Sequence, residues 1–338
     1  MGESRGIRFG VGLQSDKTGA DYARLGALAE AGGFDVVSVF SDLLYQPPIY
    51  ALLEMARATS RVRLGAACWN PYTLHPYEIA GQVAVLDQAS QGRAYVGLSR
   101  GAWMGAIGVA QTRPIATLRE AIGVISHLLR GDGAALEGEV FPVAAGTRLR
   151  YALPAAVPPV VVGTWGPKAA RVAGQLADEV KVGGTANPDM VRLMGRWVGA
   201  AAREAGRPPV GVTAGAVTVV DEDGAAARAR ARTEVAMYLA VVAELDPTVE
   251  LPGELLLTIK RLAEAGDYAA AGAAVPDEVL DRFAFSGTPA AIVGQVQGLV
   301  EAGATRIEFG TPHGLDSAHG IELLGRQVLP AFAQGTVG

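Results

Sequence analysis

Residues 160–168 read Val-Val-Val-Gly-Thr-Trp-Gly-Pro-Lys, an apolar run that passes through two glycines to a proline. The three valines predict a strand that is buried on both faces. Pro167 is of the residue type favoured at the first position of a helix, so we expect a helix to begin there. A buried strand, a short glycine turn and a helix form one unit of a parallel α/β fold.

The same alternation extends along the chain in both directions from this stretch. Eight β-rich runs are separated by helical patterns: Ile7–Leu13, Asp35–Phe40, Val62–Ala67, Ala94–Leu98, Val160–Gly163, Glu179–Val182, Val212–Val220 and Arg306–Phe309. Eight parallel strands with right-handed crossovers close most simply into a (β/α)8 TIM barrel. The length of 338 residues suits a single domain over 1–338, and an open doubly wound sheet is the alternative.

Two insertions interrupt the alternation. Residues 131–158, after the fourth helix, combine turn residues with a short hairpin pattern. Residues 246–284, after the seventh strand, hold helical patterns at Glu254–Glu264, Tyr268–Ala273 and Asp277–Arg282. Insertions of this kind shape the substrate mouth or form oligomer contacts, and the sequence leaves both open.

Composition excludes several classes of function. The net charge is −5 with no basic stripe, which argues against a nucleic-acid partner. A single cysteine and four scattered histidines argue against a metal site, so redox chemistry needs an organic coenzyme. No apolar run is long enough to span a membrane, and Met1–Gly6 lacks the apolar segment of a secretory signal. We therefore expect a cytoplasmic protein.

Barrel enzymes carry their chemistry at the carboxyl ends of the strands. The turn Gly163–Lys168 combines glycines, a helix start and a lysine, which together can bind a phosphate, although an ordinary βα turn looks the same. Ser99-Arg100-Gly101 is a second possible anion contact. No GxGxxG motif follows a strand, so a nicotinamide fingerprint is not supported.

Three further side chains could carry chemistry. Cys68 ends a strand, but no base lies near it in sequence, which favours a structural thiol over a nucleophile. His313 lies in a loop at the predicted mouth and is a candidate acid or substrate contact. Glu308 is a carboxylate inside a strand, where it is either paired with an arginine or functional.

An ordered set of short motifs extends along nearly the whole chain. They are Arg8–Val11, Ala29–Asp35, Leu64-Gly65 through Asn70–Tyr72, Leu86-Asp87 through Gly92–Ala94 and Gly97-Leu98, Gly163 with Gly166-Pro167, Phe283–Pro289 and Leu323–Gly325. Together, at these spacings, they resemble the luciferase-like barrel superfamily. Within it the nearest resemblance is to the deazaflavin-dependent methylenetetrahydromethanopterin reductases.

The resemblance implies that the deazaflavin coenzyme F420 lies with its ring in the barrel mouth, with FMN or NAD(P)H as alternatives. It implies a cis peptide bond at Ala67–Cys68 and a phosphate at Gly163–Lys168. The expected coenzyme contacts are Asp42, Ala67, Cys68, Asn70, Ser99, Arg100, Gly101, Gly163, Thr164, Trp165, Gly166, Pro167 and Lys168.

The chain departs from the reductase pattern at acidic positions. Gly12 stands where the family has a glutamate, Ala102 where it has an aspartate, and Leu43 where it has a histidine. Glu308 is a candidate to have taken over as the proton source. The candidate catalytic residues are Glu308, His313 and Asp42.

The resemblance implies hydride transfer to a C=N bond or a conjugated C=C bond of a small metabolite. An iminium carbon accepts hydride without prior protonation, which suits a site that lacks strong acids. The alternatives are an FMN-dependent monooxygenase, an NAD(P)H-dependent reductase of folate-type substrates, and an inert barrel kept as a binding subunit. We expect a homodimer with a small-molecule substrate.

Overall fold

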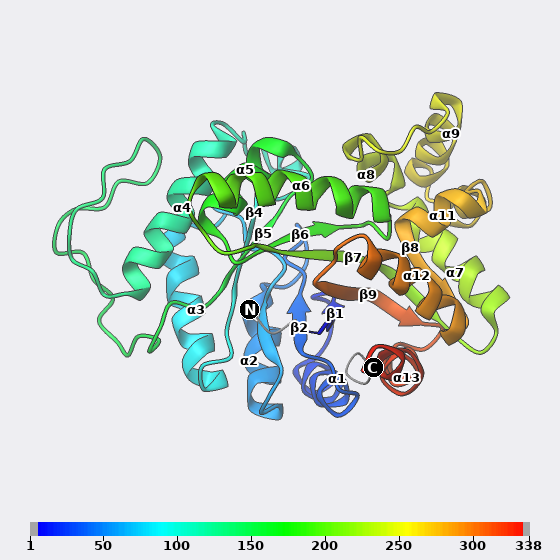
Figure 1. Ribbon diagram of the computed structural model, residues 1–338, viewed down its shortest axis with the longest axis horizontal. Coiled ribbons are helices and arrows are strands. Elements are labelled where there is room, and N and C mark those ends of the chain that lie inside the picture. Colours follow the sequence, from blue (N-terminus) through cyan, green and yellow to red (C-terminus); the bar gives the residue numbers. More distant parts are fainter. Residues whose placement is uncertain (1–5, 334–338) are drawn as a thin grey trace.

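The structure is a computed structural model that describes residues 6–333. Its strands are β1 (Arg8–Leu13), β2 (Val36–Val39), β3 (Arg63–Ala66), β4 (Val96–Ser99), β5 (Val160–Gly163), β6 (Glu179–Gly183), β7 (Gly211–Val220), β8 (Ala284–Gly287) and β9 (Arg306–Gly314). All named pairings are parallel, in the order β3-β2-β1-β9-β7-β6-β5-β4. The bridges Leu64–Ala94 and Trp69–Leu98 join the two ends of this order. The predicted eight-stranded barrel is confirmed (Figure 1).

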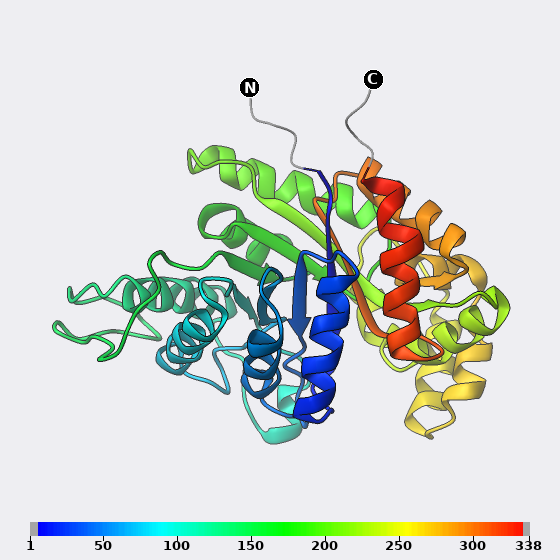
Figure 2. The same cartoon turned by 90° about the horizontal axis from the view of Figure 1, so that it is seen from below.

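Helices cover the outside of the barrel (Figures 1 and 2). They are α1 (Gly19–Ala31), α2 (Pro48–Ala58), α3 (Pro76–Ser90), η1 (Met104–Ile107), α4 (Pro114–Leu129), α5 (Pro167–Leu176), α6 (Pro188–Glu204), α7 (Gly224–Ala236), α8 (Leu239–Leu245), α9 (Gly253–Glu264), α10 (Tyr268–Ala273), α11 (Asp277–Phe283), α12 (Pro289–Glu301), α13 (Ser317–Leu323), η2 (Leu324–Val328) and η3 (Leu329–Phe332). No helix within residues 6–333 has the length and apolar character needed to cross a membrane.

The structure corrects two strand predictions. β8 was not predicted as a strand, because its four residues follow α11 without a turn. It pairs with Val217–Val220 at the end of β7, beyond the residues of β7 that pair with β6. β9 was predicted to end at Phe309 but continues to Gly314, because His313 and Gly314 pair with Val219 and Val220 of β7 after a register shift.

The insertions pack in different ways. Residues 131–158 form an extended loop, in which Leu136 and Val143 make one antiparallel bridge (Figure 1). Helices α7 to α11 pack with β8 and Val219 in a second apolar cluster. Trp165, in the turn after β5, contacts both this cluster and the main core. The second insertion therefore borders the predicted anion turn.

Candidate active site

The strand register brings candidate residues to one level of the barrel. Ser99 of β4 pairs with Gly163 of β5, and Gly163 pairs with Lys181 of β6. Side chains alternate along a strand, so Glu179, Lys181 and Gly183 share one face of β6. The carboxyl ends of β4, β5 and β6 therefore form one side of a mouth, as predicted for a barrel.

The loop after β3 reaches across to β5. The bond Ala67–Cys68 is cis, as the resemblance implies. A Cβ on Gly163 would stand 3.0 Å from Cys68 Sγ and 3.3 Å from Ser99 Cβ, so the glycine is needed for this close contact. Burial raises the pKa of the Cys68 thiol to about 11, against the opposing charge of Lys181. The thiol is protonated at neutral pH, which favours the structural interpretation.

Asn70 connects the loops after β3 and β4. Its Oδ1 accepts hydrogen bonds from the backbone N–H groups of Tyr72 (3.2 Å) and Thr73 (3.0 Å), and the side chain is buried. A Cβ on Gly101 would stand 3.1 Å from Asn70 Cβ. Gly101 has φ +76°, a conformation that glycine adopts readily. Asn70 therefore fixes the loops that form this part of the mouth. Arg100 beside it is exposed.

The turn after β5 has the features of an anion site. Thr164 donates its backbone N–H to the carbonyl of Lys181 (3.0 Å), and Gly166 donates to Thr164 Oγ1 (3.1 Å). Gly166 is the N-cap of α5, and no side chain caps this helix. Pro167 has no N–H, so the N–H groups of Lys168 and Ala169 are the ones in this first turn that remain available to an anion. Pro167 begins α5, as predicted.

Asp42 lies after β2 and is exposed to solvent. The surrounding protein nevertheless raises the pKa of its carboxyl group through desolvation. A hydrogen bond with Gln14 and the charge of Lys181 act in the opposite direction. Asp42 is exposed, whereas the other two candidate catalytic groups, Glu308 and His313, are buried. The raised pKa of Asp42 favours its protonated form.

A chain of alternating charges fills the barrel interior. Lys181 pairs with Glu308, Glu308 with Arg306 (3.3 Å), Arg306 with Glu179 (2.5 Å), and Glu179 with Arg8 (2.6 Å). Sequence reasoning singled out Glu308 alone. Charged residues at alternate positions, Glu179 with Lys181 and Arg306 with Glu308, were the signal, because alternate residues share the inner face of a strand.

Glu308 is paired with Lys181 and Arg306, the first of the two interpretations that the sequence allowed. Its carboxylate also accepts a hydrogen bond from Ser38 Oγ (2.6 Å), and its side chain is 1% exposed. Although burial alone would raise the pKa of Glu308, the charges of Lys181 and Arg306 lower it. A carboxylate held in the ionised form has no proton to give, which argues against Glu308 as the proton source.

The space at position 12 is occupied by other side chains. A Cβ on Gly12 would stand 2.6 Å from Phe40 Cζ and 3.1 Å from Glu308 Oε1. The Phe40 ring and the Glu308 carboxylate therefore take the volume into which a glutamate at this position would extend. In this chain, the space beside Gly12 is therefore already filled.

His313 is buried in β9 and lies against β1. Its Nε2 is 3.0 Å from the carbonyl oxygen of Gly12, which can only accept, so Nε2 carries the proton. Nδ1 has no partner among the described residues. Burial lowers the pKa of His313 to about 4, so the ring is neutral near pH 7. These features argue against His313 as an acid in the mouth.

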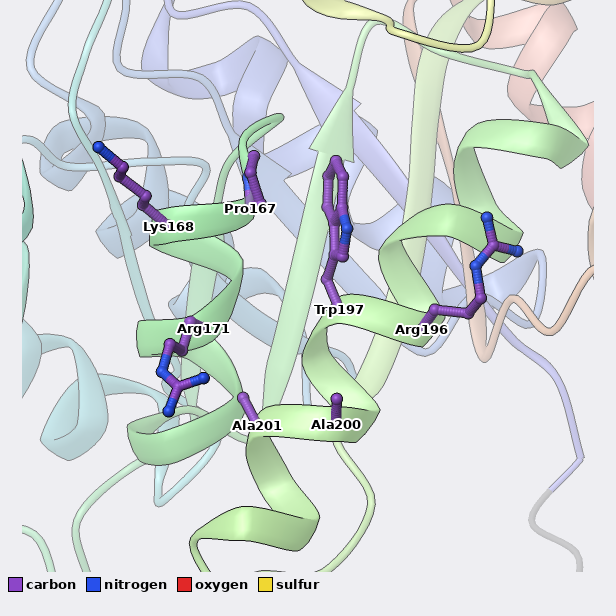
Figure 3. A pocket seen from close by; sticks show the side chains of 7 residues that line it. All are labelled: Pro167, Lys168, Arg171, Arg196, Trp197, Ala200 and Ala201. Atoms are coloured by element: carbon purple, nitrogen blue, oxygen red, sulfur yellow. The ribbon is translucent and has the colours of Figure 1, made fainter.

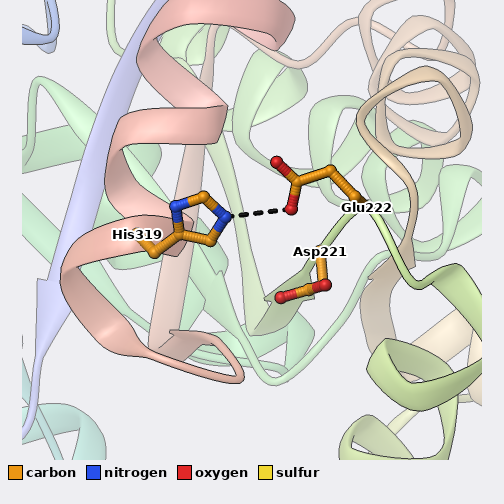
Figure 4. A group of neighbouring side chains, drawn as sticks. All are labelled: Asp221, Glu222 and His319. Carbon is orange, nitrogen blue, oxygen red and sulfur yellow. Dashed lines mark hydrogen bonds and ion pairs between the residues drawn. The ribbon is translucent and has the colours of Figure 1, made fainter.

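One pocket and one cluster of titratable side chains lie outside the mouth. A pocket of about 380 Å³ between α5 and α6 is lined by Lys168, Arg171, Arg196 and Trp197 (Figure 3), so the side chain of Lys168 faces the outer helix layer. Asp221, Glu222 and His319 gather where β7 ends and α13 begins (Figure 4). His319 Nε2 lies 2.9 Å from Glu222 Oε2, and this hydrogen bond raises the pKa of His319.

Comparisons with known proteins extend over the full chain. A 5,10-methylenetetrahydromethanopterin reductase from Archaeoglobus fulgidus is 29% identical over 337 residues, which cover 96% of this chain and 99% of that protein. The solved coenzyme F420 dependent tetrahydromethanopterin reductase from Methanopyrus kandleri has a TM-score of 0.87 at 26% identity, covering 97% of this chain and all of that one.

A third similarity concerns the fold alone. The solved structure of an F420-dependent secondary alcohol dehydrogenase, in complex with an F420-acetone adduct, has a TM-score of 0.80 at 21% identity. It covers 98% of this chain and 100% of the other. Residues 6–306 also match the family described as luciferase-like monooxygenase. With its parallel barrel and its mouth at the carboxyl ends of the strands, the chain belongs to the luciferase-like monooxygenase family.

Proposed function

We propose that the protein is a coenzyme F420-dependent oxidoreductase that reduces a C=N bond or a conjugated C=C bond of a small metabolite. The similarity to the solved coenzyme F420 dependent reductase supports the coenzyme, since it covers 97% of this chain at 26% identity. The observation that carries the proposal is the contact of Cys68 with Gly163, which joins the loop after β3 to the uncapped turn after β5.

The residues present fit such a coenzyme. The first turn of α5 offers the N–H groups of Lys168 and Ala169 to a phosphate. Glycines at 101 and 163 bring the walls of the mouth close together without adding side chains of their own. Bound in its reduced form, the coenzyme would supply a hydride. The chain would hold the substrate and exclude water, because hydride transfer depends above all on positioning.

Asp42 is the proton donor in this proposal. Its raised pKa favours the protonated form, and the residue is exposed. A conjugated C=C substrate needs one proton after the hydride has been transferred. An iminium substrate needs none, so Asp42 is required for the first substrate class and not for the second.

A monooxygenase with FMN is the second candidate, because the matched family is described as luciferase-like monooxygenase. Separate titrations with reduced deazaflavin, reduced FMN and NADH distinguish the candidates, followed by coenzyme oxidation with cyclic imines and with conjugated enones. Saturable binding and substrate-dependent oxidation of the deazaflavin support the proposal. Tight binding of FMN alone, with oxygen consumption, supports the monooxygenase. Turnover with any coenzyme contradicts an inert barrel.

We also propose a homodimer with a small-molecule substrate. Analytical ultracentrifugation measures the oligomeric state directly, and a sedimenting species with the mass of one chain would contradict the homodimer.

A further inference from the structure

We infer that Lys181, oriented by Glu308, is a positioning residue. It sets the electrostatic potential at the floor of the mouth, the level of the barrel at which Lys181 pairs with Gly163. This potential favours negative charge on a ring bound there. The inference rests on the proposed function, which places the coenzyme ring in this mouth.

Lys181 lies beside the anion turn. It lies in register with Gly163, and its carbonyl oxygen accepts the hydrogen bond of Thr164 at 3.0 Å, so its backbone supports the anion turn. Its side chain runs into the barrel, where its Nζ lies 5.2 Å from the centre of the Phe40 ring. A Cβ on Gly215 would stand 3.3 Å from Lys181 Cε, so this glycine leaves room for the lysine.

The buried charges alternate in sign along the barrel interior. The interior chain runs Lys181, Glu308, Arg306, Glu179, Arg8, with three cations and two carboxylates. Arg8, at one end, is 41% exposed, whereas the side chains of Lys181 and Glu308 are 8% and 1% exposed. Lys181 is the cation at the other end of the chain, level with the residues of the mouth. An alternating chain that ends on a cation presents positive charge on that side.

The charge of Lys181 acts on titratable groups in two loops of the mouth. The groups that act on the Cys68 thiol are Lys181 and Arg306, which lower its pKa, and Glu308, which raises it. Lys181 also lowers the pKa of Asp42. Cys68 and Asp42 belong to different loops of the mouth. The charge of Lys181 therefore affects both the loop that holds Cys68 and the loop that holds Asp42.

The chemical consequence concerns reduction. A deazaflavin or flavin that takes up two electrons and one proton becomes an anion. A fixed cation in a water-poor site stabilises such charge far more than it would in water. Glu308 holds the ammonium group in place and at the same time reduces its effect. Removing Lys181 and removing Glu308 should therefore change the electrostatic potential at the bound ring in opposite directions.

Cys68 permits a test that needs no coenzyme, because it is the only cysteine of the chain. The pKa of the thiol is measured from the pH dependence of its alkylation by iodoacetamide. We expect Lys181→Met to raise this pKa and Glu308→Gln to lower it, with the double variant in between. Lys260→Met, an exposed lysine of α9, serves as the matched control and leaves the pKa unchanged.

The second measurement uses the coenzyme. The ratio of the Kd for reduced F420 to the Kd for oxidised F420 should rise by roughly 10- to 100-fold in Lys181→Met, the range expected for loss of a charge-assisted contact. In Glu308→Gln the ratio should fall. Lys181→Arg keeps the charge and should stay near the wild type. Circular dichroism checks folding, and the double variant avoids a lone buried charge if a single variant fails to fold.

The outcomes separate the two proposals. Shifts of the same sign in Lys181→Met and Glu308→Gln, or no shift in either, overturn the inference, because a purely structural pair would act in one direction only. If wild-type protein binds neither deazaflavin nor FMN, the proposed function falls on that result, and the thiol pKa values still decide whether the pair sets the potential at the floor.

Discussion

The sulfur atom of Cys68 lies 3.0 Å from the point where a Cβ on Gly163 would stand. The loop after β3 and the end of β5 can approach this closely because residue 163 has no side chain. We expect Gly163→Ala to push the two apart, at a cost of about 1–3 kcal/mol for overpacking. Isothermal titration should show a Kd for coenzyme F420 raised by roughly tenfold.

Gly294→Ala in α12 is the control for this prediction, since a Cβ there meets nothing within 4 Å. Alanine in a helix is also more favourable than glycine, so this variant should bind as the wild type does. Equal affinities of Gly163→Ala and wild type would show that the contact has no part in coenzyme binding.

Asp42→Asn tests the proton donor. With a conjugated C=C substrate, kcat should fall by roughly 10²–10⁴-fold, the usual range for loss of a general acid. The donor acts in its protonated form, and the pKa of Asp42 is raised. Wild-type activity should therefore persist above the pH at which an ordinary aspartate ionises and decline as the pH passes the raised pKa. This decline should be absent from the variant, and a pH profile shared by both proteins would refute the assignment.

Arg306→Met tests the interior charge chain. Arg306 is 2% exposed and contacts both Glu179 and Glu308, so its removal leaves two buried carboxylates short of a partner. Breaking a buried pair in this way costs about 3–5 kcal/mol, measurable by urea unfolding. The exposed pair of Arg24 and Asp21 provides the control, because Arg24→Met should cost at most about 1 kcal/mol. Similar losses in the two variants would argue against a stabilising chain.

His313 predicts a pH effect on stability. Its pKa is about 4 in the folded protein, whereas the ordinary pKa of a histidine is 6.5, so the unfolded chain takes up a proton that the folded chain refuses. Stability contributed by the neutral ring is complete above pH 6.5 and falls as the pH drops towards 4, by up to about 3 kcal/mol. His313→Gln should have a flatter acid limb in urea unfolding. The exposed His319, whose pKa Glu222 raises, supplies a contrast, because His319→Gln should not flatten the acid limb. A wild-type slope in His313→Gln would disprove the idea.

Much of the fold was predictable from local patterns. Apolar runs such as Val160–Gly163 identify buried strands, and glycines and prolines mark where helices begin and end. The short strand β8 was missed, because only its pairing with the far end of β7 distinguishes it from the helix before it. The extension of β9 was missed because Gly310, Pro312 and Gly314 are typical turn residues.

The site was predictable where it lies at strand ends and was missed inside the strands. The rule for barrel mouths identified Cys68, Ser99 and Gly163, which the structure brings together. Lys181 was missed although it is, like Glu308, a charged residue inside an apolar strand. Its partner Glu308 is 127 residues away in sequence, and only the closed barrel brings the two together. Contacts of this range need the fold before they can be inferred.

The most direct test of the proposed function is a fluorescence titration of the purified protein with coenzyme F420 and, separately, with FMN. Trp165 lies in the turn after β5 and is a natural reporter of binding there. The account predicts saturable quenching by F420 with one site per chain, and much weaker quenching by FMN. Saturable binding of FMN without binding of F420 would contradict it.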